Sequence, residues 1–61
     1  MAWLAVDKNG DEYVYSWEPY RECENGYVFW MSESDCVELL KGSIKKLIGK
    51  ELTWDEEPVE I

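Results

Sequence analysis

The sequence predicts an α+β fold: a small twisted antiparallel sheet of about three to five short strands, with one short helix packed on one face. Short runs of aromatic and β-branched residues alternate with turn signals, which is typical of strands. A single stretch, residues 39–50, carries both start and stop signals for a helix. The 61 residues suffice for one small core, so we expect one domain over residues 1–61.

The clearest hairpin is expected from residues 3–7 and 11–17, two β-like runs that flank the turn signal Lys8-Asn9-Gly10. Two registers are possible. A two-residue loop at Asn9-Gly10 would mix aliphatic and aromatic side chains on both faces, whereas a type I turn over residues 7–10 with Gly10 as a bulge would separate them. Asp at the first turn position and Gly at the last favour the type I turn. One face would then carry Leu4, Val6 and Val14, and the other Trp3, Ala5, Tyr13, Tyr15 and Trp17.

The middle of the chain is expected to leave the sheet and return to it. Pro19 ends the second strand, and residues 18–26 predict a polar excursion that contains the turn signal Asn25-Gly26. Residues 27–31 are the densest apolar run, so they predict the central or best-buried strand. For residues 36–39 the pattern allows either a short strand or part of a helix capped by Ser34.

The helix is expected between Gly42 and Gly49. Ser43 can cap its first turn, and Gly49 can adopt the left-handed conformation that ends it. Such a short helix needs an apolar support, which must be the sheet. The side chains at i, i+3 and i+4 should all dock there, namely Ile44, Leu47 and Ile48.

After the helix, residues 51–54 predict a last strand with Leu52 and Trp54 on the same face. The run 55–58 then turns the chain outward, because it is acidic and ends in Pro58. Residues 59–61 are expected to add edge pairing or to fray.

The charge balance restricts the kinds of partner. With 14 acidic and 6 basic side chains the formal net charge is -8, which repels phosphate backbones and anionic lipids and favours a basic protein. The same repulsion favours a monomer. No apolar run is long enough to span a membrane and no signal peptide is evident, so we expect a cytoplasmic protein in which Cys23 and Cys36 are unpaired.

Catalytic and metal-binding chemistry is not expected. The chain has no His, so Ser–His and Cys–His nucleophiles are absent, and we predict a non-enzymatic protein without cofactor or metal. Asp7, Asn9, Asp11 and Glu18 match positions of a calcium-loop template, but Glu12 stands where that loop needs Gly, which favours a plain hairpin turn.

Two groups of residues are candidates for partner binding. An aromatic hairpin face left uncovered by the helix would be an apolar docking patch, although burial in the core is its other possible fate. The acidic turn could supplement it by contacting a basic partner. We therefore expect a protein–protein interaction module, with a nucleic-acid-mimicking inhibitor of a host nucleic-acid-binding protein as the alternative. The candidate residues are Trp3, Tyr13, Tyr15, Trp17, Asp55, Glu56 and Glu57.

Two pieces of the chain also resemble known sequences. They are residues 3–7 and the stretch from Lys41 to Glu60 that contains Lys46-Leu47-Ile48-Gly49 and Leu52-Thr53-Trp54. Both are similar to short uncharacterised proteins from phage and mobile-element regions of gut bacteria. The resemblance brings no activity and no site residues, and residues 18–36 lie outside it. It favours an accessory protein that acts by binding.

Overall fold

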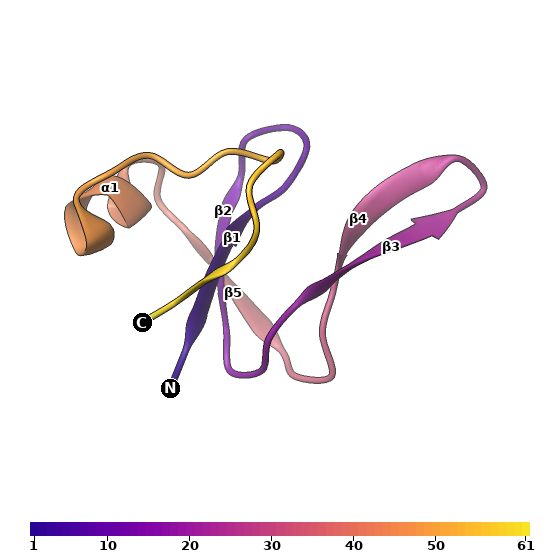
Figure 1. Ribbon diagram of the computed structural model, residues 1–61, viewed down its shortest axis with the longest axis horizontal. Coiled ribbons are helices and arrows are strands. Elements are labelled where there is room, and N and C mark those ends of the chain that lie inside the picture. Colours follow the sequence, from indigo (N-terminus) through magenta and orange to yellow (C-terminus); the bar gives the residue numbers. More distant parts are fainter.

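The computed structural model describes residues 1–61, which form six strands in two antiparallel sheets and one short helix (Figure 1). A four-stranded sheet has the order β5-β2-β1-β6, and β3 pairs with β4 in a separate hairpin. The result is a small, sheet-rich domain with more strands than expected. The elements are β1 (Trp3–Val6), β2 (Glu12–Tyr15), β3 (Tyr20–Glu24), β4 (Tyr27–Met31), β5 (Cys36–Leu39), α1 (Ser43–Ile48) and β6 (Val59–Glu60).

The register predicted for the first hairpin is confirmed. Leu4 lies opposite Val14 and Ala5 opposite Tyr13, so the aliphatic and aromatic side chains separate onto two faces. The turn is closed by a hydrogen bond of 3.0 Å from the Gly10 N–H to the Asp7 carbonyl, and Gly10 has a φ of 92° that favours glycine. The Asp7 carboxylate accepts the Asp11 N–H, which shows that these residues of the calcium-loop template shape the turn.

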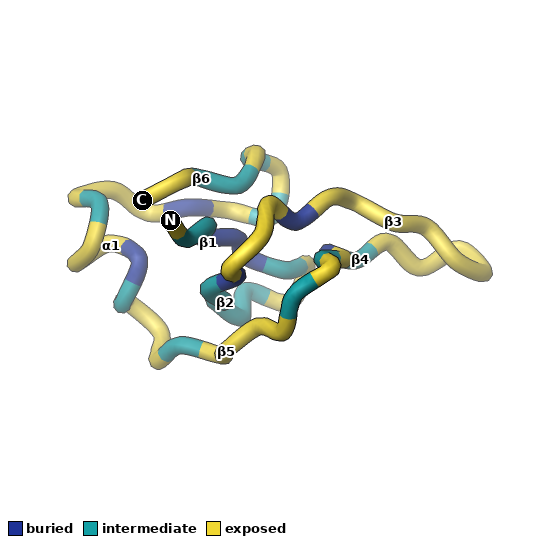
Figure 2. The backbone as a smooth tube through the Cα atoms, turned by 90° about the horizontal axis from the view of Figure 1, so that it is seen from below, coloured by how far each residue is buried: buried dark blue, intermediate teal, exposed yellow.

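The two faces of β1 belong to two small cores. Leu4 and Val6 join Ile44 and Leu52 on one side of the sheet, and Ala5 joins Tyr15 and Trp30 on the other. In Figure 2 the longest buried run lies along β1, whereas the other buried residues are single positions spread along the chain. Side chains alternate along a strand, so Leu4 and Val6 face one core and Ala5 faces the other. β1 is the only strand with buried residues on both faces.

Helix α1 docks through a narrower stripe than expected. Ile44 is 1% exposed and Ile48 is half-buried, but Leu47 is 58% exposed, so the prediction that Leu47 docks is wrong. Positions four apart lie nearly above one another on a helix, whereas a position three along lies further round. In this six-residue helix Ile44 and Ile48, which are four positions apart, pack on the aliphatic core, and Leu47 points away from it.

The cap of α1 also differs from the prediction. Ser43 is the first helical residue and makes no capping bond, while Gly42 occupies the cap position with a φ of 92°. The Glu12 carboxylate of β2 accepts the Gly42 N–H at 2.8 Å and the Ile44 N–H at 2.9 Å. Glu12 lies opposite Val6 on the aliphatic side, so these bonds satisfy a charge that would otherwise sit against apolar side chains. Gly49 ends the helix as predicted.

Two other predicted strands are corrected. Residues 51–54 are not a strand, because Thr53 and Glu56 form a turn that sends Leu52 to the aliphatic core and Trp54 to the aromatic one. Residues 27–31 form β4 but not a central strand, since their partner is the neighbouring β3, inside the segment expected to be a polar excursion. Of the alternatives left open by the sequence, residues 36–39 form a short strand rather than a helix, and the C-terminus pairs at the edge of the sheet.

Both thiols are unpaired and exposed, as expected for Cys23 and Cys36. They belong to strands of different sheets, β3 and β5. The structure has no helix with the length and hydropathy needed to cross a membrane.

Candidate partner-binding surface

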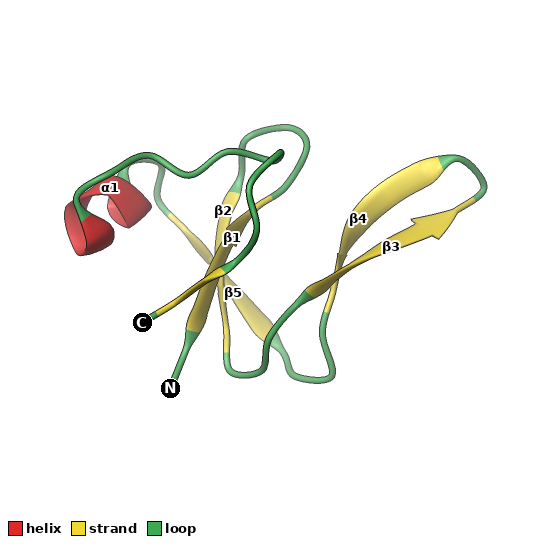
Figure 3. Cartoon of the chain, viewed as in Figure 1, coloured by secondary structure: helices red, strands yellow, loops and turns green.

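The hairpin of β3 and β4 projects from the body of the domain. Asn25 and Gly26 both have positive φ, 53° and 82°, which is the conformation of a type I′ turn and explains the Asn-Gly signal. The turn sets Glu24 opposite Tyr27, and the register continues to Tyr20 opposite Met31. Figure 3 shows the two strands extending away from the loops that connect them to β2 and β5.

The base of the hairpin is anchored by Trp30. Its ring is 8% exposed in the aromatic core, and its indole N–H donates to the Val6 carbonyl at 2.7 Å. The Trp54 ring packs edge-to-face against it with centroids 5.5 Å apart. An isolated two-stranded hairpin is only marginally stable in water, so these contacts are what hold the arm in place.

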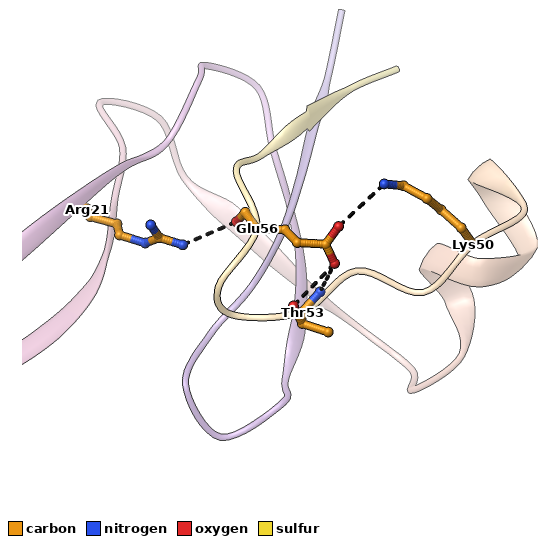
Figure 4. Close-up of polar contacts among 4 residues, drawn as sticks. All are labelled: Arg21, Lys50, Thr53 and Glu56. Carbon is orange, nitrogen blue, oxygen red and sulfur yellow. Dashed lines mark hydrogen bonds and ion pairs between the residues drawn. The ribbon is translucent and has the colours of Figure 1, made fainter.

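Arg21 of β3 joins the same anchor. Its guanidinium carbon lies 4.7 Å from the Trp30 ring centroid and 5.1 Å from that of Trp54. It donates to the carbonyls of Trp54 and Glu56, the latter at 3.2 Å (Figure 4), and pairs with the Glu57 carboxylate at 3.6 Å. Arg21 therefore fastens the hairpin to the C-terminal loop.

That loop is fixed from within by Glu56. Its carboxylate accepts the backbone N–H of Thr53 at 3.0 Å and the Thr53 hydroxyl at 3.2 Å, and Lys50 donates to its other oxygen (Figure 4). The bonds from the Thr53 N–H and hydroxyl, with a smaller effect of Lys50, lower the pKa of Glu56 below its ordinary value. This stabilisation is present at neutral pH and is lost on acidification through the lowered pKa.

One face of the hairpin is largely exposed and packs against neither core. Residues directly opposite each other share a face, so the face turned away from Trp30 carries both apolar and acidic side chains. Tyr27 is 76% exposed, Tyr20 49% and Met31 43%, and Phe29 is half-buried. We call this surface the outer face: Tyr20, Glu22, Glu24, Tyr27, Phe29 and Met31.

Trp17 is a further exposed aromatic residue, in the segment that leads into the hairpin. Its side chain is 66% exposed, while its backbone is held on both sides by hydroxyls. The Trp17 N–H donates to Ser34 Oγ and its carbonyl accepts from Ser32 Oγ, each at 3.1 Å. A large exposed ring on a fixed backbone loses little conformational entropy when it is buried by a partner.

The structure separates the residues that the sequence singled out. Three of the aromatic candidates gather in the aromatic core, where Tyr15 is 6% exposed and Trp3 and Tyr13 are half-buried. Of the acidic candidates, Asp55 and Glu57 are exposed, and Glu56 is engaged by Thr53 and Lys50. Among the aromatic candidates, Trp17 is the one that is exposed.

Four exposed or half-buried residues of the outer face escaped the sequence analysis, namely Tyr20, Tyr27, Phe29 and Met31. The signal that could have found them is the pair of runs on either side of Asn25-Gly26. The two runs, residues 20–24 and 27–31, have five residues each and are joined by a two-residue turn. This pattern predicts a local hairpin. Because β4 pairs with β3 alone, it is not a central strand.

The buried phenol of Tyr15 predicts an alkaline loss of stability. Burial, and to a lesser extent the Cys36 thiol, raises the pKa of Tyr15 from 10.0 to about 12. Burial and nearby carboxylates led by Glu38 also raise the pKa of Tyr13. The unfolded chain therefore releases protons first, and the free energy of unfolding should fall between about pH 10 and 12, by on the order of 2 kcal/mol for Tyr15.

Urea unfolding at a series of alkaline pH values measures this loss. Tyr15→Phe should flatten the decline, while Tyr27→Phe, a change at an exposed ring, should leave it in place. An equally steep decline in Tyr15→Phe would show that the buried phenol is not responsible.

The chain has no metal-binding cluster and two open hollows. No group of three or more His, Cys, Asp or Glu side chains is arranged to hold a metal ion. The larger of two open hollows, about 400 Å³, lies at the start of β3 and is lined by Glu18, Pro19, Tyr20, Arg21 and Glu57. No protein-family model, curated protein or solved structure matches the chain.

Proposed function

We propose that the protein is a non-enzymatic interaction module that binds a basic protein through the outer face of its β3–β4 hairpin. The carrying observation is the combination of exposed apolar side chains with carboxylates on one anchored arm. Exposed aromatic patches of this kind are typical of partner-binding surfaces.

Charge supports a basic partner. Glu22 and Glu24 lie on the same face as the exposed rings, and the molecule as a whole carries a formal charge of -8. Arg21, the cation of β3, is engaged by the Trp54 and Glu56 carbonyls and by Glu57. Lysine or arginine side chains of a partner could pair with the glutamates and lie over the rings of Tyr27 and Phe29.

The resemblance to proteins of phage and mobile-element regions supports an accessory protein that acts by binding. The two unpaired thiols fit a reducing compartment, and we propose the cytoplasm as its location.

A displayed random-peptide library tests this function without a known partner. We expect the parent chain to enrich peptides that combine lysine or arginine with apolar residues. The double variant Tyr27→Ser with Phe29→Ser should bind them about tenfold more weakly or worse, because it removes rings of the expected binding hot spot. The matched control Leu40→Ser changes an apolar residue that is 85% exposed and lies outside the hairpin, and should bind normally.

Two results would contradict the proposal. Normal binding by the folded double variant would place the binding surface elsewhere. Loss of binding on neutralising Asp55 and Glu57, with steep salt dependence and competition by duplex DNA for the partner, would instead favour the nucleic-acid-mimicking inhibitor.

A further inference from the structure

We propose that the free edge of β3 binds a basic extended segment of the partner as an added strand. The inference rests on the proposed function and specifies how the partner docks on the hairpin. It follows from the backbone groups of β3, the alternatives among the other sheet edges, and the charges beside this edge.

The backbone of β3 has unused hydrogen-bonding groups. A two-residue loop makes Glu24 and Tyr27 a hydrogen-bonded pair, and antiparallel pairing alternates bonded and non-bonded pairs from there. The N–H and C=O groups of Arg21 and Cys23 consequently point away from β4. All five residues of β3 are exposed, and none is a proline or lysine that would block strand addition.

The other strand edges are poorer candidates. Trp30 lies on the free edge of β4 and is 8% exposed, so half of the outward groups of β4 are covered. The edge strand β6 has only two residues and follows Pro58. The edge strand β5 is exposed but carries one carboxylate, Glu38.

Charge distinguishes the β3 edge. Glu22 and Glu24 alternate along it on the outer face, so a strand with basic residues at every second position would bring them beside these carboxylates. At the start of β3 the open hollow of about 400 Å³ is lined by Glu18 and Glu57. Arg21 also lines this hollow and pairs with Glu57, which leaves the Glu18 carboxylate to receive a further basic side chain of the added strand.

The occupant is therefore an extended segment in which lysine or arginine alternates with apolar residues. The backbone hydrogen bonds would supply affinity, and the alternating side chains would supply specificity. The apolar residues of such a segment would face away from the carboxylates.

Hydrogen exchange with a synthetic peptide tests this mode of binding. The probe is a blocked peptide of about eight residues in which lysine alternates with valine, and its control has the same composition in two blocks. With the alternating peptide bound, the amides of Arg21 and Cys23 should exchange at least about tenfold more slowly, because each gains a backbone acceptor. The block peptide should bind more weakly and protect neither.

Two variants at one position give a second readout. Cys23→Pro removes an N–H that the hairpin itself does not use, and should weaken binding of the alternating peptide about tenfold or more. Cys23→Ser keeps the N–H and should bind normally. Amide spectra establish whether Cys23→Pro is folded, and the exchange measurement on the parent chain tests the inference if it is not.

The outcomes separate this inference from the proposed function. Binding that shifts the signals of Tyr27 and Phe29 without protecting Arg21 and Cys23 would overturn strand addition and leave the outer face as the binding surface. Protection of Cys36 and Glu38 instead would move the added strand to β5 and overturn the inference. Absence of binding by either peptide, together with failure of the library selection, would overturn both.

Discussion

Replacement of Trp30 by alanine is expected to lower the free energy of unfolding by about 3–5 kcal/mol, the range found when a buried aromatic side chain is truncated. The change removes the ring between the hairpin and the main sheet, the hydrogen bond to the Val6 carbonyl and the contacts with Arg21 and Trp54. A domain of this size is expected to be stable by only about 3–9 kcal/mol, so the variant should be close to unfolded at room temperature. Urea unfolding followed by circular dichroism measures the difference.

Trp17→Ala is the matched control for this change. The same ring is removed from a side chain that is 66% exposed, so the loss should stay near 0.5 kcal/mol, on the order expected for surface substitutions. Trp30→Phe should be intermediate, with a loss of about 1–3 kcal/mol, because it leaves the Val6 carbonyl without its donor. Equal stabilities for Trp30→Ala and Trp17→Ala would show that the hairpin is not anchored through Trp30.

Replacement of Ile44 by alanine is expected to lower the free energy of unfolding by about 2–5 kcal/mol. Ile44 is 1% exposed and joins Leu4, Val6 and Leu52 in the aliphatic core, so its truncation leaves a cavity that the short helix cannot fill. Thermal or urea unfolding of the purified variant measures the effect.

Leu47→Ala provides the control on the same helix. Leu47 is 58% exposed, and alanine has the higher helix propensity, so this variant should lie within about 0.5 kcal/mol of the parent. A large loss for Leu47→Ala with a small one for Ile44→Ala would mean that the helix docks through its other side.

The parts of the fold that local chemistry determines were predictable from the sequence. The type I turn over residues 7–10 fixes the register of β1 and β2, and that register alone separates the aliphatic from the aromatic face. Gly42 and Gly49 bound the helix for the same local reason, since both adopt the left-handed conformation.

The misjudged parts depend on contacts between distant residues. The helix cap comes from Glu12, 30 residues before Gly42, and no local pattern indicates it. Trp54 crosses to the aromatic core because Thr53 and Glu56 form a turn fastened by Arg21, 35 residues before Glu56. Ordinary strand alternation would have kept it beside Leu52.

The proposed binding surface differs from the sequence-based candidates for a related reason. A dense apolar run such as Tyr27–Met31 looks the same in sequence whether its second face is buried by the domain or left for a partner. Its partner strand, Tyr20–Glu24, carries charged residues at three positions and therefore lacks the apolar pattern of a strand. The aromatic residues of β2 were identified correctly as one face, but Trp30 and Trp54 cover part of it.

The most direct measurement of the central claim, that an anchored hairpin presents an uncovered outer face, is nuclear magnetic resonance with a soluble paramagnetic probe. We expect strong broadening of the Tyr20, Tyr27 and Met31 side-chain signals, and protection of the Trp30 indole N–H and the Tyr15 ring. Broadening of the Trp30 indole signal to the same degree as Tyr27 would show a detached hairpin, and protection of Tyr27 and Met31 would show that the outer face is covered; either result would contradict the claim.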